Sequence, residues 1–474
     1  MGEPHPQHTS LTGYSTSDHN FYNKSMYKRL YRRSTMLEVH RTHRAAICNH
    51  SQVADALDRH GWSASKLWNV ANHHSRQVWD ETGKIPDHEE LKDELKDHPK
   101  YKGLHSQSSQ RVLEELAESF NSWYSSDDDR ANPPGYRKEN YYDDEGRRVH
   151  EEHPRSTVTW KQNGIRHDTK NNRVRLSKGA NHKEHPKAWE YILVEYETRP
   201  GVTVKNLQQV RAVYDSATER WELHLICKDE IETPTAPGEE TAGIDLGISN
   251  FAAVAYSTDD ANLYPGTRLK QDGYYFPKEI ANCDDSSGNR ATRLHNKWSE
   301  RRTHFFHSLA THIVERCVEK GVCRINIGDL EGVRENDDGA AKNWGRHGNL
   351  DLHGWAFDRF SKILTYKAKV EGIEVEEVSE RDTSKTCSVC GTADDSQRVE
   401  RGLYVCDECD AAFNADVNGA ENIRLDINNT ESNSESSAGL DEDRSTGWLA
   451  QPVVHLYDLS CGFQPQAEVV DCKP

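Results

Sequence analysis

Apolar residues recur at helical spacings between about Met36 and Tyr124, as they do along one face of an amphipathic helix. The polar segment Lys84–Lys102 interrupts this pattern. We therefore expect a small helical bundle with a break in its middle. The apolar positions that carry the prediction are Val53, Leu57, Leu67, Val70, Ala71, Val78, Val112, Leu113, Leu116, Phe120 and Trp123.

The period changes to that of strands between about Ser156 and Asp229. Turn signals such as KQNGIRH and YDSATER separate the alternating stretches. Much of the positive charge lies here, so we expect a small β-barrel with a basic surface. The stretches are STVTWKQ, RVRLSKG, YILVEYE, QQVRAVYD and RWELHLICKDE.

Beyond the linker ETPTAPGEE, strands and helices alternate, which predicts an α/β sheet with parallel strands. After Leu425 the stretch INNTESNSESSAGLDEDRSTG is acidic and of low complexity, which predicts that the tail is partly disordered. The expected elements are AGIDLGISNFAAVAY (strand), NRATRLHNKWSERRTHFFHSLATHIVERCVEK (helix), VCRINIGDL (strand), LHGWAFDRFSKILTYKAKVEG (helix) and IEVEEVSE (strand).

Composition narrows the class of protein. The 474 residues allow roughly three domains. No apolar run of about 18 residues is present, and the beginning MGEPHPQHTSLTGYSTSDHN lacks the apolar core of a signal peptide. We therefore expect a cytoplasmic protein that does not cross a membrane.

The formal net charge of −18 argues at first against nucleic acid as a partner. The basic residues are clustered, however, in Lys24–Arg44 and Arg155–Lys187. Basic stripes within an acidic coat suggest a nucleic-acid binder from a high-salt cytoplasm, where screening weakens long-range repulsion. An ordinary acidic protein with two solvated basic faces is the alternative, and the charges alone leave both open.

Two closely spaced cysteine pairs give the strongest chemical signal. In CSVCGTADDSQRVERGLYVCDEC each pair places two thiolates on a tight turn, and the residues between the pairs could form a hairpin. This spacing is typical of a closed tetrahedral zinc site, which is structural because no coordination position stays open. The predicted ligands are Cys387, Cys390, Cys406 and Cys409; the other seven cysteines are scattered, and we assign them no role.

Two aspartates stand in unusual settings. Asp245 lies inside an apolar strand, where a carboxylate is costly to bury unless it binds a cation or a hydrogen-bonding partner. Asp416 begins an expected helix that carries Asn418 and Asn422 on one face. An acidic turn and a helix cap are the alternatives. Together the two aspartates suggest a magnesium site, in which paired ions activate water for phosphodiester cleavage.

Four stretches resemble a known family: GIDLGISNFAAVAYS, DTSKTCSVCG, YVCDECDAAFNADVNGAENI and LHGWAFDRFSKIL. They resemble the TnpB (OrfB) proteins encoded by insertion sequences, particularly the halophilic archaeal branch, which are relatives of the type V CRISPR effectors. The resemblance is strong from Thr241 to Arg424 and weaker back to about Met36. It implies an RNA-guided DNA endonuclease with a multidomain α/β plus β fold.

The resemblance also implies an architecture: a RuvC/RNase H-like nuclease domain with a zinc-ribbon insertion, a basic β-barrel (wedge) domain and a helical recognition bundle. The implied partners are a guide RNA and double-stranded DNA, bound by a monomer, with structural zinc and catalytic magnesium as cofactors. The expected boundaries are 1–35 (barrel segment), 36–130 (recognition), 131–237 (barrel), 238–426 (nuclease, zinc ribbon at about 383–412) and 427–474 (acidic tail).

The stretch RINIGDLEGV departs from the family pattern. It resembles a buried strand that runs into acidic residues. The family's nuclease site uses three carboxylates, of which Asp245 and Asp416 carry over. The third is usually a Glu that ends this strand, and Gly328 stands at its position. Two-metal chemistry would therefore need a replacement ligand.

Three nearby acids could replace the missing Glu. Asp329 and Glu331 have the wrong parity, because neighbours along a strand face opposite sides; Glu331 could still reach the site if the strand ended at Leu330 and the chain curled back. Glu380 ends the next expected strand, and the ends of parallel neighbours lie about 4.8 Å apart, so its carboxylate could enter the vacated space. We favour Glu380; a surface residue paired with Arg381 is the alternative reading of this position.

We therefore predict a magnesium-dependent DNA endonuclease with Asp245, Glu380 and Asp416 as catalytic metal ligands. A nuclease-dead RNA-guided DNA-binding protein, acting in repression or transposition, is the alternative; a zinc-ribbon RNA-binding protein without a DNA target is a third. A basic helix is expected to contact guide RNA or heteroduplex phosphates, although each of its residues could equally lie on a solvated face. Its residues are Arg290, Arg293, Lys297, Arg301 and Arg302.

Overall fold

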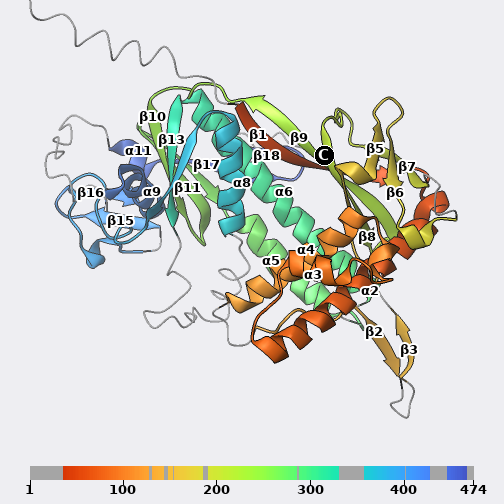
Figure 1. Cartoon of the computed structure of the whole chain (residues 1–474). Coiled ribbons are helices and arrows are strands. Elements are labelled where there is room, and N and C mark those ends of the chain that lie inside the picture. The colour runs from red at the N-terminus through yellow and green to blue at the C-terminus, as the bar shows by residue number, and fades with distance from the viewer. Residues whose placement is uncertain are drawn as a thin grey trace, which may run out of the picture. The chain divides into compact units, whose positions relative to one another are not determined.

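The computed structural model describes residues 36–126, 131–142, 148–152, 154–184, 190–285, 288–329, 357–400, 402–427 and 446–466. Two compact units divide them (Figure 1). The barrel unit comprises Leu37–Ile231 and Thr267–Phe305, and the sheet unit comprises Met36, Glu232–Gly266 and the described residues from Phe306 onward. Among the described residues, no helix is long and apolar enough to cross a membrane.

The barrel unit is built on a seven-stranded sheet in the order β4-β8-β9-β1-β7-β6-β5. Its edge strands β4 and β5 are joined by a three-residue 3-10 turn, Gln162–Gly164, so the sheet must curl until its edges meet. The five expected strand stretches all lie in it. The strands are β1 (Met36–Ile47), β4 (Val158–Lys161), β5 (Ile165–Asp168), β6 (Arg173–Ser177), β7 (Tyr191–Thr198), β8 (Leu207–Asp215) and β9 (Arg220–Glu232).

The expected helical pattern from Met36 is wrong for its first twelve residues. They form β1, which pairs antiparallel with β7 and buries Ala45 and Ile47. The polar segment Lys84–Lys102 also contains a short helix, which begins with a capping box between Asp87 and Glu90. The helices are α2 (His50–Thr82), α3 (His88–Leu95) and α4 (Ser106–Tyr124); the 3-10 turns Tyr101–Gly103 and Ala180–His182 also lie in this unit.

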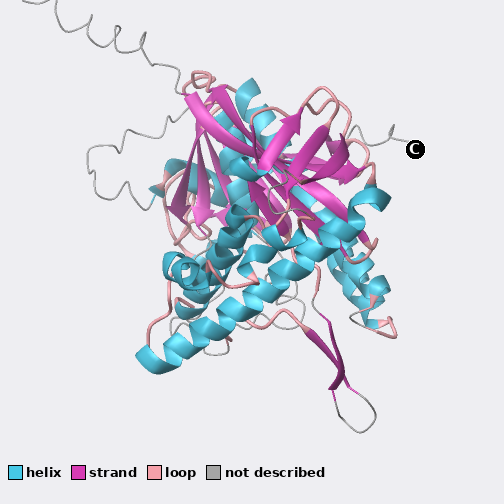
Figure 2. Ribbon diagram, turned by 45° about the vertical axis from the view of Figure 1, so that its right-hand side comes forward, coloured by secondary structure: helices cyan, strands magenta, loops and turns pink. Residues whose placement is uncertain are grey.

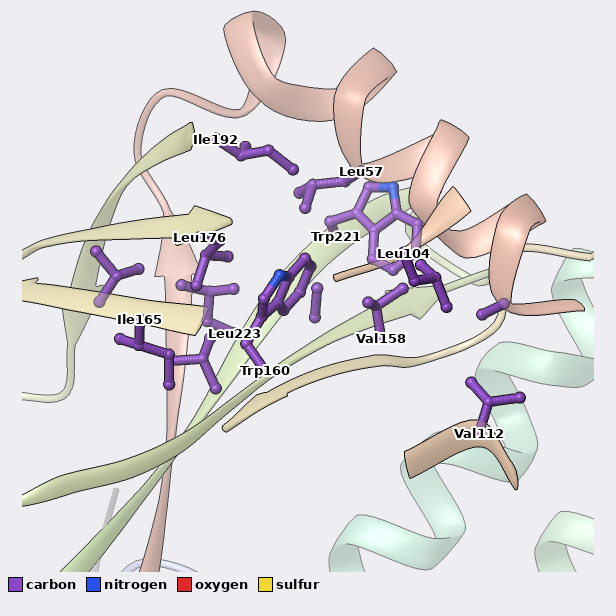
Figure 3. Close-up of a cluster of buried hydrophobic side chains, with 14 of the residues drawn as sticks. Leu57, Leu104, Val112, Val158, Trp160, Ile165, Leu176, Ile192, Trp221 and Leu223 are labelled. Atoms are coloured by element: carbon purple, nitrogen blue, oxygen red, sulfur yellow. The ribbon is translucent and has the colours of Figure 1, made fainter. Parts of the chain in front are cut away.

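The helices and the barrel share one hydrophobic core rather than forming separate domains. Leu57 of α2 and Val112 of α4 belong to the same buried cluster as Trp160, Trp221 and Leu223 of the sheet (Figure 3). The expected boundary near residue 130 therefore divides a continuous core. Strands β2 (Glu139–Tyr142) and β3 (Arg148–Glu152) form a separate two-stranded sheet, which projects as an arm in Figure 2.

The sheet unit contains a mixed seven-stranded sheet in the order β14-β13-β10-β11-β12-β17-β18. Strands β10, β13 and β14 are parallel, as expected, whereas β10, β11 and β12 form an antiparallel meander. The expected parallel pairing is thus present between β10, β13 and β14. The strands are β10 (Glu240–Leu246), β11 (Asn250–Tyr256), β12 (Asp260–Pro265), β13 (Val322–Asp329), β14 (Glu374–Ser379), β17 (Val453–Asp458) and β18 (Gly462–Pro465).

Helices cover both faces of this sheet. On one face Phe251 stacks on Phe306 of α6 (Asn289–Glu319) and on Phe357 of α8 (Phe357–Val370). On the other face α9 (Ala415–Leu425) lies directly on β10, because Gly243 has no side chain to hold it away. Helix α5 (Thr267–Ala281) and the first part of α6 belong to the barrel unit.

The end of the chain contains elements that the sequence analysis did not predict. Residues 428–445 and 467–474 lie outside the described residues, but between them α11 (Gly447–Ala450), β17 and β18 extend the sheet. Strand β17 pairs parallel with β12. Leu449, His455 and Phe463 are buried, which explains why this part of the expected acidic tail is folded.

A buried histidine makes the stability of the barrel unit depend on pH. The Nδ1–H of His60 donates to the Ala56 carbonyl, and its Nε2 accepts from the Gly179 amide, so the neutral ring is fully bonded. Burial lowers the pKa of His60 to about 4. The contribution of His60 to the free energy of unfolding is therefore complete above pH 6.5, which is the pKa of histidine in the unfolded chain. This contribution is lost as the pH falls toward 4.

We expect up to about 3 kcal/mol of unfolding free energy to disappear over this range. Urea unfolding followed by tryptophan fluorescence at pH 7 and pH 4.5 measures the loss. His60→Gln should show a smaller difference between the two pH values than wild type, whereas the exposed His73→Gln should not. An unchanged difference in His60→Gln would contradict the assignment.

Candidate functional site

Three strand ends meet at one edge of the sheet unit. Strands β10, β13 and β14 are parallel neighbours, so their C-terminal ends lie together. The register pairs Ile244 with Ile327 and Gly328 with Val378. Asp245 therefore lies beside Gly328, and both share a face with Val378 and, two residues further on, Glu380.

Glu380 occupies the space that a side chain at Gly328 would need. A Cβ built on Gly328 would lie 2.5 Å from the Glu380 Cγ and closer still to its Oε1. The Oε1 atom is buried and has no hydrogen-bond partner. The structure thus places the Glu380 side chain next to Gly328, while Asp329, paired with Ser379, starts on the opposite face.

Helix α9 brings the third acid to the same place. Asp416 lies in the first turn of α9, and its Oδ2 accepts from the Asn250 amide at 2.8 Å. One turn on, a Cβ at Gly419 would lie 2.9 Å from the Asp245 Oδ2, so the helix rests against that carboxylate. The guanidinium of Arg398 lies 3.6 Å from Asp416.

The carboxylates repel one another in a setting with little water. Burial, and then the charge of Asp416, raise the pKa of Asp245 to about 7, against a smaller opposing effect of Arg398. Burial, then Asp245 and Asp329, raise the pKa of Glu380 to about 9. An unpartnered buried oxygen and two carboxylates that resist ionisation fit a site completed by a divalent cation.

The three carboxylates are less tightly grouped than a preformed ligand cage. Among the residues that the structure describes, the only group of three or more His, Cys, Asp or Glu side chains close enough to share a metal ion is the cysteine cluster, whose ligand atoms all lie within 4.8 Å of one another. The acids therefore share one edge and influence each other's ionisation without direct contact among all three. Such spacing suits ions that keep several waters, as Mg²⁺ does. Glu331, the other acid considered, lies outside the described residues.

The four predicted zinc ligands converge as the sequence spacing indicates. The Sγ atoms of Cys387 and Cys409 are 3.8 Å apart, and those of Cys390 and Cys406 are 3.5 Å apart. A tetrahedral ion with metal–sulfur bonds of 2.3 Å requires sulfurs about 3.8 Å apart. The sulfurs are too distant for a disulfide. The cluster could therefore hold a metal.

The cysteine loops differ in detail from the expected hairpin. The hairpin forms around the second pair instead: β15 (Leu403–Cys406) and β16 (Ala411–Asn414) are antiparallel, with Cys409 in their turn. The first pair lies in a loop closed by a bridge between Thr386 and Ala393. Each pair thus has its own tight turn, which is the geometry of a zinc ribbon.

The five basic residues of the expected nucleic-acid-binding helix differ in their exposure and in their contacts. Arg290, Arg293 and Lys297 are exposed on α6, although the Arg293 Nε also donates to the Ala217 carbonyl. Arg301 forms a 2.8 Å ion pair with Asp272 of α5, so it joins two helices of the barrel unit. Arg302, partly buried, lies over the Trp298 ring.

Sequence reasoning missed two groups of residues at this site. Arg398 stands in a loop with no regular period, and only the fold places it beside Asp416. The sequence pattern places Asn418 and Asn422 on one face of the Asp416 helix but assigns them no role. Both are completely buried, and polar residues at two successive turns of a buried helix are a signal for specific hydrogen bonds.

Known proteins share these features. Residues 222–334 match OrfB_IS605, described as a probable transposase, and residues 357–423 match the TNB domain of Cas12f1-like proteins. The TnpB-like protein ORF457 of Acidianus two-tailed virus is 25% identical over 407 residues, covering 76% of this chain and 80% of that protein. The putative RNA-guided DNA endonuclease InsQ of Escherichia coli is 24% identical over 238 residues, covering 46% and 58%.

Solved structures add the fold. The Cas12f1–sgRNA–target DNA complex aligns with a TM-score of 0.54 over 79% of this chain and 82% of that chain, at 14% identity. The protein thus shares a multidomain α/β fold with that Cas12f1 chain. The chain thus matches the OrfB_IS605 family model in its middle part and is similar to TnpB-like proteins over most of its length.

The cysteine cluster should bind one metal ion per chain. We expect about one zinc per protein molecule by plasma mass spectrometry, and close to none in Cys406→Ser, because three thiolates leave the tetrahedral shell open. Cys317→Ser is the matched control: this buried cysteine lies outside the cluster and should keep the zinc. Full zinc content in Cys406→Ser would contradict the assignment.

Glu380 should destabilise the protein when no divalent cation is added. Because its pKa in the fold exceeds that in the unfolded chain, ionisation costs stability increasingly as the pH rises from 4.5 toward 9. Glu380→Gln should therefore melt higher than wild type at pH 8, by about 3 °C or more, with little difference at pH 5. The exposed Glu377→Gln, on the strand that ends just before Glu380, should melt like wild type.

Proposed function

We propose that this protein is an RNA-guided DNA endonuclease whose RuvC-type site uses Asp245, Glu380 and Asp416 as magnesium ligands. The carrying observation is that the Glu380 carboxylate fills the space above Gly328, beside Asp245, in a chain that is similar to TnpB-like proteins. An RNase H-like interpretation agrees with the sheet, in which a three-stranded meander is followed by two parallel strands.

Each side chain has a separate task in this proposal. Asp245 and Asp416 hold the cation from β10 and from the start of α9, and Glu380 supplies the third carboxylate from β14. Bound Mg²⁺ would activate the attacking water and stabilise the leaving oxygen. Asn250 orients Asp416 by its 2.8 Å hydrogen bond. Arg398 brings a positive charge that could stabilise the phosphate as its charge grows.

The proposed partners follow from the similar proteins named above and from the charge pattern. The guide RNA would carry the sequence information, while the protein recognises a short flanking motif and the shape of the backbone. The exposed Arg290, Arg293 and Lys297 would contact phosphates. Arg301 is withdrawn from this list because its partner is Asp272. The cysteine cluster would hold structural zinc, and the protein would act as a monomer with its RNA.

The nuclease reading is tested with matched DNA, magnesium, high salt and the RNA that copurifies with the protein. Wild type should cleave, and Asp245→Ala and Glu380→Ala should each lose about a hundredfold or more in rate while still binding DNA. Glu331→Gln should cleave normally. Binding without Asp245-dependent cleavage would instead support the nuclease-dead alternative.

A double substitution sharpens the test of Glu380. Gly328→Glu alone should be destabilised, because its Cβ meets the Glu380 side chain. In the double variant Gly328→Glu/Glu380→Ala, the space that the Glu380 side chain now fills is free. The third carboxylate then lies on β13, where the family usually has it. Cleavage should recover at least tenfold over Glu380→Ala alone. No recovery, with both proteins folded, would argue against Glu380 as the third ligand.

A further inference from the structure

The first cysteine loop is hydrogen-bonded to the helix that carries Asp416. The amide oxygen of Asn418 accepts from the Ser388 backbone N–H at 2.9 Å, and its nitrogen donates to the Thr386 carbonyl at 2.8 Å. Ser388 and Thr386 are the two neighbours of Cys387 in the chain. Asn418 thus forms hydrogen bonds with both peptide groups that flank Cys387.

A second asparagine continues the connection toward Glu380. The Asn422 nitrogen donates to the carbonyls of Thr386, at 2.7 Å, and Thr383, at 2.8 Å. Thr383 in turn donates twice to the Glu380 carbonyl, from its backbone N–H at 3.2 Å and from Oγ1 at 2.8 Å. The path from the cysteine loop to the acid is continuous.

These bonds lie in a dry environment. Asn418 and Asn422 are exposed by 0% and 1%, and Thr383 by 5%. Buried amide groups lose more when a partner is removed than exposed ones do, because no water replaces it. Because breaking the Asn422 hydrogen bonds is costly, a displacement of the cysteine loop should also displace the end of β14.

We infer that Asn418 and Asn422 are positioning residues that make divalent-cation binding at the carboxylates depend on the metal in the cysteine cluster. The inference rests on the proposed function, since it concerns the same three acids. Asp416 is fixed by the helix itself and Asp245 by the strand beneath it, whereas Glu380 lies just beyond its strand. Glu380 is the ligand whose position the asparagines determine.

The test measures cation binding directly, with Mn²⁺ as a paramagnetic substitute for Mg²⁺. Free Mn²⁺ is followed by electron paramagnetic resonance during titration of the full-length protein with its RNA, and zinc is measured in the same samples. Asn422→Ala should weaken Mn²⁺ binding by about tenfold or more while keeping its zinc. Its half-maximal magnesium concentration for cleavage should rise, with activity recovering at high magnesium.

Asn72→Ala is the matched control. Asn72 is also buried and also donates from its side-chain nitrogen to two backbone carbonyls, those of Pro134 and Gly135, but it lies in the barrel unit. It should leave Mn²⁺ affinity unchanged. If Asn422→Ala does not fold, Thr383→Val takes its place: it keeps the shape and the backbone bond but removes the Oγ1 bond to Glu380, and should also weaken Mn²⁺ binding.

The dependence on the cysteine metal is tested by a double-mutant cycle. Cys406→Ser should weaken Mn²⁺ binding, and adding Asn422→Ala to it should cost much less than in the wild-type background. Wild-type Mn²⁺ affinity in folded Asn422→Ala and Thr383→Val would overturn this inference alone. If the wild type showed no Mn²⁺ binding that Asp245→Ala removes, the proposed function would be overturned, and this inference with it.

Discussion

The close contact between α9 and β10 is the constraint on which the rest of the sheet unit depends. A Cβ at Gly243 would come within 2.5 Å of the Arg424 backbone nitrogen and closer to the Ala420 carbonyl, so only glycine permits this approach. The contact places Asp416 near Asp245 and turns Asn418 and Asn422 toward the cysteine loop. Without this contact α9 would lie further from the sheet. It could then neither place Asp416 near Asp245 nor hydrogen-bond the cysteine loop.

The sequence predicted best those features that depend on local pattern. The strand of Asp245, the long helix with Phe305, Leu309 and Ile313, and the cysteine ligands follow from period or spacing within short windows, and the structure has them. The strand Met36–Ile47 was missed because it pairs with β7, far away in the chain, and that pairing outweighs local helical spacing.

The same distinction explains the candidate site. Parity along one strand argued against Asp329, and parallel pairing with the next strand favoured Glu380, because both rules need only strand identity and direction. Arg398 and Asn250 could not be found this way. Each reaches Asp416 through the folded arrangement of separate segments, from a ribbon loop in one case and from the meander in the other. No local pattern encodes such contacts.

The exchange of a carboxylate between strands has a steric condition. A side chain at position 328 and the present Glu380 conformation exclude each other, since both claim the space beside Asp245. A glutamate side chain is flexible, however, and near the end of a strand it could turn outward at the cost of its rotamer preference and of its present packing. An acid at position 380 could thus be carried beside an intact site and turn inward once position 328 lost its side chain. The buried, unpartnered Oε1 is what such an inward turn leaves behind: an oxygen that gains little from the protein and is stabilised by a cation.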